Sequence, residues 1–263
     1  MKLRALFKTR PITKDAPPPS GGREITNDEY SFARSADDYN RDRLSEFRVA
    51  RALMFAASGR NAITDLAEPG VLMLATAIST FKRSVTILEF GGGTGYHATV
   101  LNDLLPGSIS RYVVVELPAQ VRAANGRIEG VEFADHLPDG GIDIVFSSGA
   151  LQSTHAPLDF LRRLCLLEAP SMVLTRNFFS DRQLYVEHRT GLFNHGAGPV
   201  PNGFTNEVTM MYMQSLCEKD FLDLVTTRYR KRAKLPNSSG VPLQCPDAYG
   251  IDYLFEARLG GIA

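Results

Sequence analysis

A carboxylate and a run of glycines are spaced in a way that could bind a nucleotide-like ligand. Glu89 lies in residues 85–90, an apolar run whose β-branched composition predicts a buried strand. The turn that follows is rich in glycine: Gly91, Gly92, Gly93 and Gly95. Glycine is needed where the backbone takes a positive φ or approaches a ligand closely. Because residues 96–105 suit the opening of a helix, free N–H groups should surround a ligand above the strand end.

The spacing of these glycines argues against a dinucleotide site. A G-x-G-x-x-G fingerprint counted from Gly91 needs its third glycine at position 96, where Tyr96 stands. Counted from Gly92, the second glycine is replaced by Thr94. An NAD-linked oxidoreductase is therefore disfavoured.

A second carboxylate ends the next run of β-forming residues. Glu116 closes residues 112–116, 21 residues beyond Gly95. An acidic side chain at this distance from a glycine loop can accept hydrogen bonds from both hydroxyls of a ribose. The competing interpretation is a solvated charge at a strand end. Leu117 and Pro118 follow, and proline suits the first turn of a helix.

Two later segments predict further strands that end in polar or small residues. The alternating pattern of residues 131–136 predicts a short strand that ends in Asp135 and His136. Residues 142–152 predict a central strand that opens into a loop of small residues, Ser147, Ser148, Gly149 and Ala150.

These segments together resemble the class I S-adenosylmethionine-dependent methyltransferases. The resemblance implies that Glu89 helps to hold the methionine ammonium group and that the glycines admit the methionyl and ribose parts of the cofactor. It also implies a ribose site at Glu116, with Leu117 as a further cofactor-binding residue, an adenine site at Asp135, and a methyl-transfer centre bordered by Ser147 and Ser148. The implied cofactor-binding residues are Glu89, Gly91, Gly92, Gly93, Glu116, Leu117, Asp135, Ser147 and Ser148.

A narrower resemblance, over roughly residues 39–176, is to a family of bacterial methyltransferases. It rests on Phe-Gly-Gly-Gly at 90–93, Val-Val-Glu-x-Pro at 114–118 and Phe-Ser-Ser-Gly-Ala-Leu-Gln at 146–152. Members often occur beside genes for polysaccharide or specialised-metabolite synthesis, which implies a small-molecule or sugar-like acceptor. Related sequences usually carry an aromatic residue after the Leu-Gln pair, whereas this chain has Ser-Thr-His at 153–155, where a substrate would lie.

Two histidines are the candidates for a general base. A hydroxyl acceptor would benefit from one, and histidine suits that task near neutral pH. His155 is the first candidate because it follows the fourth strand by a few residues, and His195 in a glycine- and proline-rich segment is the second. Exposure or simple packing is the alternative for each. The histidines and carboxylates show no spacing typical of metal ligands, so no metal is expected.

The overall composition limits the classes of partner and the cellular location that are expected for the chain. The 263 residues carry 29 basic and 29 acidic side chains, and this balance argues against nucleic acid as a partner. The longest apolar stretch, Val71–Ile78, is too short to cross a membrane. Three scattered cysteines indicate buried thiols, and no apolar run near the start suits a signal peptide. A cytoplasmic location is expected.

The chain is expected to divide into three parts. Residues 1–27 predict a flexible arm, or a swapped arm that packs on a second subunit of a homodimer. Residues 28–82 predict a helical cap, and residues 83–263 predict the methyltransferase domain, with a lid-like insertion at about 178–206.

The fold class expected is α/β: a Rossmann-like, doubly wound, seven-stranded and mostly parallel sheet with an antiparallel last strand. The function expected is S-adenosylmethionine-dependent O- or N-methylation of a small-molecule or sugar-like metabolite. A non-catalytic binding or scaffold protein of the same fold is the alternative. Base methylation of nucleic acid is disfavoured, because the Asp/Asn-Pro-Pro-aromatic turn of such enzymes is replaced by Ser-Ser-Gly-Ala at 147–150.

Overall fold

The main feature of the fold is a seven-stranded sheet with strand order β4-β3-β2-β5-β6-β10-β9. The computed structural model describes residues 21–33, 38–57, 69–237, 239, 241–242 and 245–258. Neighbouring strands from β4 to β6 are parallel, whereas β10 is antiparallel to both β6 and β9. The strands are β2 (Val85–Phe90), β3 (Ile109–Val115), β4 (Glu132–Ala134), β5 (Ile144–Ser148), β6 (Ser171–Phe179), β9 (Tyr229–Pro236) and β10 (Tyr249–Ala257). The predicted mixed sheet is thus confirmed.

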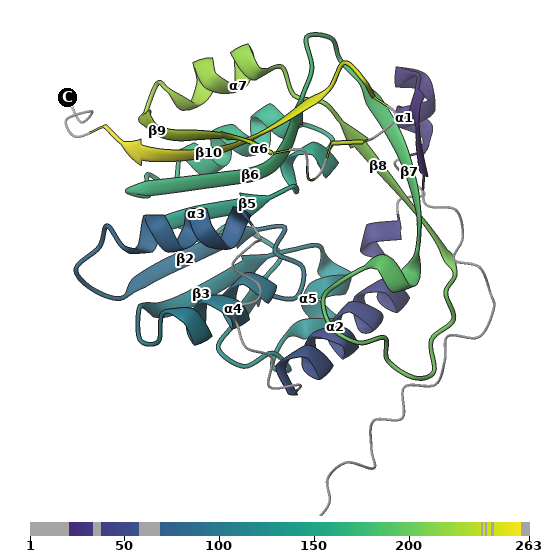
Figure 1. The fold of residues 1–263 in the computed structure, drawn as a ribbon, viewed down its shortest axis with the longest axis horizontal. Helices are drawn as coiled ribbons and strands as arrows, with labels where there is room; N and C mark the ends of the chain where they lie inside the picture. Colours follow the sequence, from purple (N-terminus) through teal and green to yellow (C-terminus); the bar gives the residue numbers. More distant parts are fainter. Residues whose placement is uncertain are drawn as a thin grey trace, which may run out of the picture.

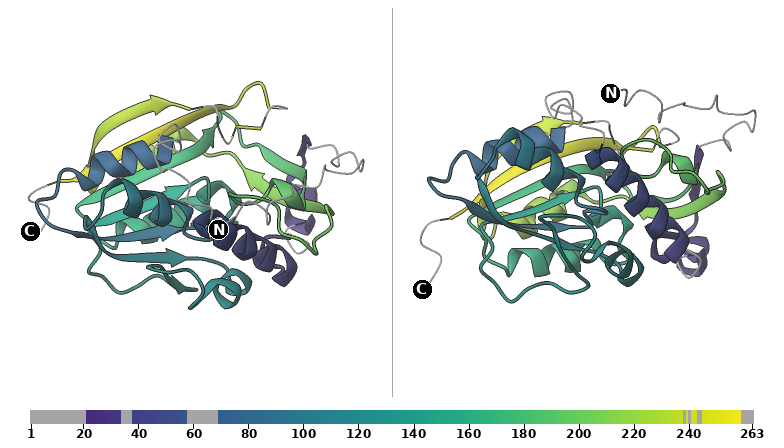
Figure 2. Two further views of the ribbon diagram at one scale, coloured as in Figure 1. Left: turned by 60° about the horizontal axis from the view of Figure 1, so that its bottom comes forward. Right: turned by 90° about the horizontal axis from the view of Figure 1, so that it is seen from below.

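Helices cover both faces of this sheet, as Figures 1 and 2 show. Alternate residues of β2 point to opposite faces, so Ile87 packs in one buried cluster and Leu88 in the other. The first cluster includes residues of α3 (Pro69–Ile78), α4 (Tyr96–Leu104) and α5 (Pro118–Ala124). The second includes residues of α6 (Pro157–Cys165) and α7 (Glu218–Val225). This arrangement is the doubly wound α/β fold.

A second, three-stranded antiparallel sheet stands beyond the carboxyl ends of the parallel strands (Figure 1). It consists of β1 (Gly21–Ile25), β7 (Tyr185–Gly191) and β8 (Val208–Gln214), in the order β1-β7-β8. Residues 21–25 therefore form a strand, although the sequence suggested a flexible arm there; residues 1–20 lie outside the described part. The insertion predicted at about 178–206 contains β7, because its glycines and prolines are concentrated after residue 190.

The N-terminal helices pack on different parts of the molecule. Helix α1 (Asn27–Ala33) contacts β7, α2 (Asp42–Ala57) lies along α5, and α3 packs on the central sheet. Exposed ion pairs join α2 to the α5 region, Asp42 with Arg122 and Glu46 with Arg127. Just before α2, the Asn40 side chain accepts a hydrogen bond from the first turn of α5, at 3.1 Å from Ala119 N. Of these three helices, α2 is the one placed beside the ends of β2 and β3.

Two further features of the fold are the character of its helices and the state of its cysteines. In the described ranges, no helix has the length and apolar character needed to cross a bilayer. The three cysteines are free thiols; Cys165 and Cys245 are buried as predicted, but Cys217 is exposed. Cys217 immediately precedes α7, where a short turn at the surface leaves its side chain outside the core.

Candidate functional site

The glycine turn after β2 has the backbone geometry that its sequence predicts. Gly91, Gly93 and Gly95 all have positive φ, at 71°, 63° and 71°. The Gly91 N–H donates to Val115 O at 2.8 Å, which ties the turn to the end of β3. A Cβ added to Gly91 would lie 2.1 Å from the Ala150 Cβ. The loops after β2 and β5 therefore meet at a distance that only glycine allows at position 91.

The Glu116 carboxylate lies directly on this glycine turn. Its Oε1 accepts a hydrogen bond from Gly93 N–H at 2.9 Å, and its Oε2 accepts one from Leu117 N–H at 2.9 Å. Leu117 begins the turn into α5 and is 42% exposed. The end of β3 thus presents an anionic group and an apolar surface side by side, next to the backbone amides of the glycine turn.

Glu89 lies beneath the turn and is only 1% exposed. Its Oε2 accepts a hydrogen bond from the Tyr112 hydroxyl at 2.8 Å, and its Oε1 lies 2.7 Å from His97 Nδ1. Burial, together with the Glu89 charge, raises the pKa of Tyr112 well above its ordinary value, so the hydroxyl remains a donor. A Cβ at Gly92 would lie 2.5 Å from the Glu89 carboxylate. Glu89 is therefore in position to support the glycine turn from below.

The remaining predicted cofactor residues end the neighbouring strands. Asp135 follows β4 and is exposed; its Oδ1 lies 2.9 Å from His136 Nδ1, and this contact lowers the pKa of Asp135. Ser147 pairs with Phe90 in the parallel register of β5 and β2. The Ser147 and Ser148 hydroxyl oxygens are buried and have no hydrogen-bond partner among the described residues. All the predicted cofactor residues thus lie on four adjacent strands, β4, β3, β2 and β5, or in the turns after them.

The two candidate bases occupy different surroundings. His155 is exposed in the turn before α6, with its ring edge-on to Phe160 at 6.0 Å between centroids. His195 is 8% exposed, and its Nε2 lies 2.7 Å from Thr209 Oγ1. Burial first, and then the Arg48 charge, lower the pKa of His195 to about 3. His195 is therefore neutral at pH 7 and a weak base.

We expect His195 to make the protein less stable as the pH falls below about 6.5. In the unfolded chain it takes up a proton near its ordinary pKa of 6.5, whereas its folded-state pKa is about 3. Between these values the unfolded state binds more protons, so acid favours unfolding, and above them the effect is absent. Urea denaturation at about pH 7 and about pH 5 measures this difference in free energy of unfolding.

The difference should be smaller in His195→Gln than in the wild type, because this variant has no imidazole at position 195. An equal pH dependence in wild type and His195→Gln would contradict the assignment.

Two arginines near these strand ends were not singled out from the sequence. Arg48 of α2 reaches the glycine turn: its Nη2 would lie 3.2 Å from a Cβ on Gly93. Arg176 interrupts the buried residues of β6 with an exposed side chain and a positive φ of 56°. Each is an ordinary arginine in a segment without a motif, so only the tertiary structure brings it to the site.

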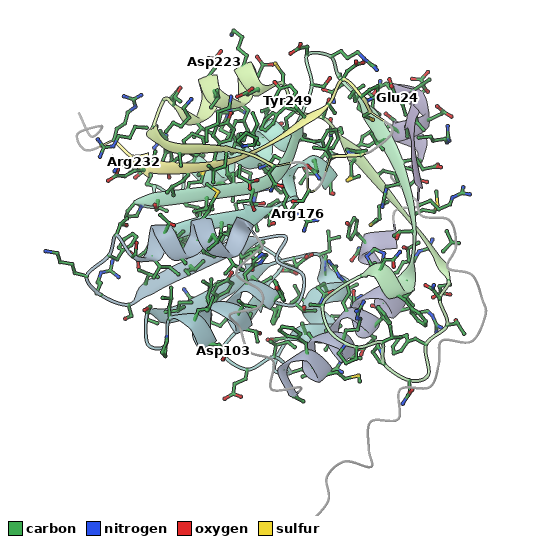
Figure 3. All side chains as sticks on the ribbon, viewed as in Figure 1. Glu24, Asp103, Arg176, Asp223, Arg232 and Tyr249 are labelled. Atoms are coloured by element: carbon green, nitrogen blue, oxygen red, sulfur yellow. The ribbon has the colours of Figure 1, made fainter. Side chains whose placement is uncertain are left out.

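A surface hollow of about 480 Å³ lies elsewhere, beside α7. Its lining includes Cys217, Glu218 and Tyr249, and none of the predicted site residues. The labels Asp223 and Tyr249 in Figure 3 mark this side of the molecule. Among the residues that the structure describes, no group of three or more His, Cys, Asp or Glu side chains is placed to hold a metal ion.

Comparison with known proteins gives only distant likenesses. No family model matches the chain, and no curated protein matches it. Among solved structures, 1,6-didemethyltoxoflavin-N1-methyltransferase from Burkholderia thailandensis, with 1,6-didemethyltoxoflavin and S-adenosylhomocysteine bound, is 17% identical, with a TM-score of 0.47 over 94% of this chain and 98% of that chain. The [4+2]-cyclase SpnF is 13% identical, with a TM-score of 0.47 over 72% and 81% of the two chains. An S-adenosylmethionine-dependent methyltransferase from Clostridium acetobutylicum is 11% identical, with a TM-score of 0.46 over 88% and 99%.

Proposed function

We propose that this protein is an S-adenosylmethionine-dependent methyltransferase that acts on a small molecule by O- or N-methylation. The observation that carries the proposal is the contact between Glu116 and the Gly93 amide, with the exposed Leu117 beside it. A ribose needs an acceptor for two hydroxyls, and an adenine ring needs an apolar surface to lie on. Both stand at the end of β3, next to a turn whose glycines allow close approach.

Each part of the cofactor is assigned a partner at these strand ends. The Glu116 carboxylate is proposed to accept hydrogen bonds from the ribose, and Leu117 to pack on the adenine. Asp135, one strand further out, would accept from the adenine amine. The methionyl part would cross Gly91, Gly92 and Gly93, and the Arg48 guanidinium beside Gly93 would pair with its carboxylate.

The chemistry asks little more of the protein than alignment. A bound S-adenosylmethionine supplies an electrophilic methyl group on a sulfonium. The chain's own task is to hold the acceptor in line with that methyl and to exclude water. The close contact of the loops at Gly91 and Ala150 keeps the two halves of the site in register. His195 is too weak a base for general-base catalysis near pH 7, so His155 remains the candidate for a hydroxyl acceptor.

Glu116→Ala should weaken S-adenosylhomocysteine binding by about 1–3 kcal/mol, the usual loss for hydrogen bonds to a charged group. Isothermal titration calorimetry of the full chain measures this directly, with NAD as a second ligand. Glu132→Ala is the matched control, because Glu132 is an exposed glutamate one strand away that pairs with Arg111.

An unchanged affinity in Glu116→Ala would remove this residue from the ribose role. Binding of NAD without binding of S-adenosylhomocysteine would overturn the proposed function. Binding of S-adenosylhomocysteine without methyl transfer to any acceptor would favour the non-catalytic alternative.

A further inference from the structure

The backbone of the central sheet is irregular at Arg176, in the second half of β6. Its φ of 56° is in the left-handed region, which a residue with a Cβ rarely adopts. Opposite it, the pairing of β10 with β6 shifts between Ile251 and Tyr253. Such irregularities occur next to active sites, where they re-aim a side chain.

A buried carboxylate holds this conformation in place. Asp252, at the shift in β10, is fully buried, and its Oδ1 accepts a hydrogen bond from Arg176 N–H at 2.6 Å. The other oxygen, Oδ2, accepts one from Asn237 Nδ2 at 2.7 Å. The Asp252 carboxylate is thus used to fix the backbone of Arg176, which leaves the guanidinium outside this interaction.

The Arg176 side chain itself is exposed and carries a charge that the described part of the protein does not neutralise. No carboxylate in the described ranges forms an ion pair with it, whereas most of the other exposed arginines there pair with Glu or Asp. Figure 3 shows Arg176 where the central strands end, facing the sheet that contains β7 and β8.

Arg176 borders the place where a methyl acceptor would lie. Its Cβ is 3.6 Å from the position of a Cβ on Gly149, in the loop after β5. Across the sheet, Glu116 and the glycine turn end β3 and β2, and Arg176 stands on β6, beyond β5. Since neighbouring strands are about 4.8 Å apart, Arg176 lies roughly 10 Å from the glycine turn, on the side away from the ribose position. With the cofactor bound as proposed above, an acceptor would approach the methyl group from this side.

Buried polar atoms beneath Arg176 add to the polar character of these strand ends. Ser148 and Thr175 are paired across β5 and β6, and neither hydroxyl has a hydrogen-bond partner among the described residues. The fully buried Asn177 also leaves both atoms of its amide group without one. Unsatisfied buried groups are rare in folded proteins, so this part of the sheet is unusual in its polar character.

From these observations we propose that Arg176 binds an oxyanion on the acceptor, so that the substrate is a small molecule carrying a carboxylate or a phosphate. That the bound anion is a methyl acceptor rests on the proposed methyltransferase function. Binding of an anion at Arg176 can be measured independently of that function. A guanidinium matches both anions because its fork of N–H donors can pair with two oxygens.

The test titrates benzoate, its neutral counterpart benzamide, and inorganic phosphate into the full chain at constant ionic strength, with and without saturating S-adenosylhomocysteine. Arg176→Asn removes the charge with a residue that tolerates positive φ, and the control is Arg232→Asn, on the outer strand β9 (Figure 3). We expect saturable binding of benzoate or phosphate but not benzamide. In Arg176→Asn the anion affinity should fall at least about tenfold. Arg232→Asn should bind as the wild type does.

The outcomes separate the two proposals. Preference for benzoate identifies a carboxylate acceptor, and preference for phosphate identifies a phosphorylated one. The inference is overturned if the wild type binds neither anion, or if Arg176→Asn does not change the anion affinity. It is also overturned if benzamide binds as tightly as benzoate. If the wild type does not bind S-adenosylhomocysteine but its anion binding depends on Arg176, the proposed function is overturned and the anion site is supported. Equal S-adenosylhomocysteine affinity in wild type and Arg176→Asn is expected, because Arg176 lies away from the cofactor residues.

Discussion

Gly91→Ala should reduce the affinity for S-adenosylhomocysteine about a hundredfold, the scale expected when a binding group is displaced by about 1 Å. The new methyl group would lie 2.1 Å from the Ala150 Cβ, so the loops after β2 and β5 must move apart. Positive φ adds strain, and together these effects should lower the free energy of unfolding by about 2–5 kcal/mol. Calorimetric titration and urea denaturation measure the two losses.

Two matched variants separate the steric clash from the backbone strain. Gly107 has a similar φ of 77° with no atom within 4 Å of an added Cβ, so Gly107→Ala should cost about 1 kcal/mol of stability without changing ligand affinity. Adding Ala150→Gly to Gly91→Ala removes the clashing atom and should restore most of the affinity. If the double variant binds as poorly as Gly91→Ala alone, contact between these loops is not what positions the site.

Glu89→Ala should lower the free energy of unfolding by about 3–5 kcal/mol, because it removes a buried carboxylate that binds two buried side chains and opens a cavity. The partners are the Tyr112 hydroxyl and the His97 ring. The glycine turn should also lose its support from below, since Gly92 packs on the Glu89 carboxylate. Urea denaturation gives the stability, and S-adenosylhomocysteine affinity reports on the turn.

A double-mutant cycle with Tyr112→Phe tests whether these losses come from the network. The two substitutions remove the same hydrogen bond, so their effects on stability should be less than additive by about 1 kcal/mol or more. Glu132→Ala, which removes an exposed glutamate, should change the stability by less than about 0.5 kcal/mol. A loss below about 1 kcal/mol in Glu89→Ala would contradict the buried role of this carboxylate.

Much of the central sheet, the glycine turn and Glu116 could be predicted from short patterns in the sequence. A β-branched run that ends in alternate glycines has few other conformations, because only glycine takes the repeated positive φ of Gly91, Gly93 and Gly95. Glu116 was found by its distance along the chain, since one helix separates two adjacent parallel strands and sets that spacing. The structure brings it to 2.9 Å from Gly93 N.

Other parts of the fold could not be predicted in the same way. Residues 21–25 were expected to be mobile, but they form β1 because β7 offers a strand edge far away in the sequence. The helical character of residues 28–57 was clear, yet α1 and α2 pack on different partners. Periodicity shows that a helix has an apolar face but does not identify what covers it.

The sequence alone determined the strand-and-glycine framework and the carboxylate at its edge, because these depend on backbone sterics and on short chain distances. Only the tertiary structure decided what each charged side chain does. It turned Glu89 inward onto Tyr112 and His97, and it left Arg176 outward on a backbone held by Asp252. Arg48 reaches the glycine turn from a separate helix. The physical reason is that the surroundings of a charge are set by contacts between segments distant along the chain, which local patterns do not record.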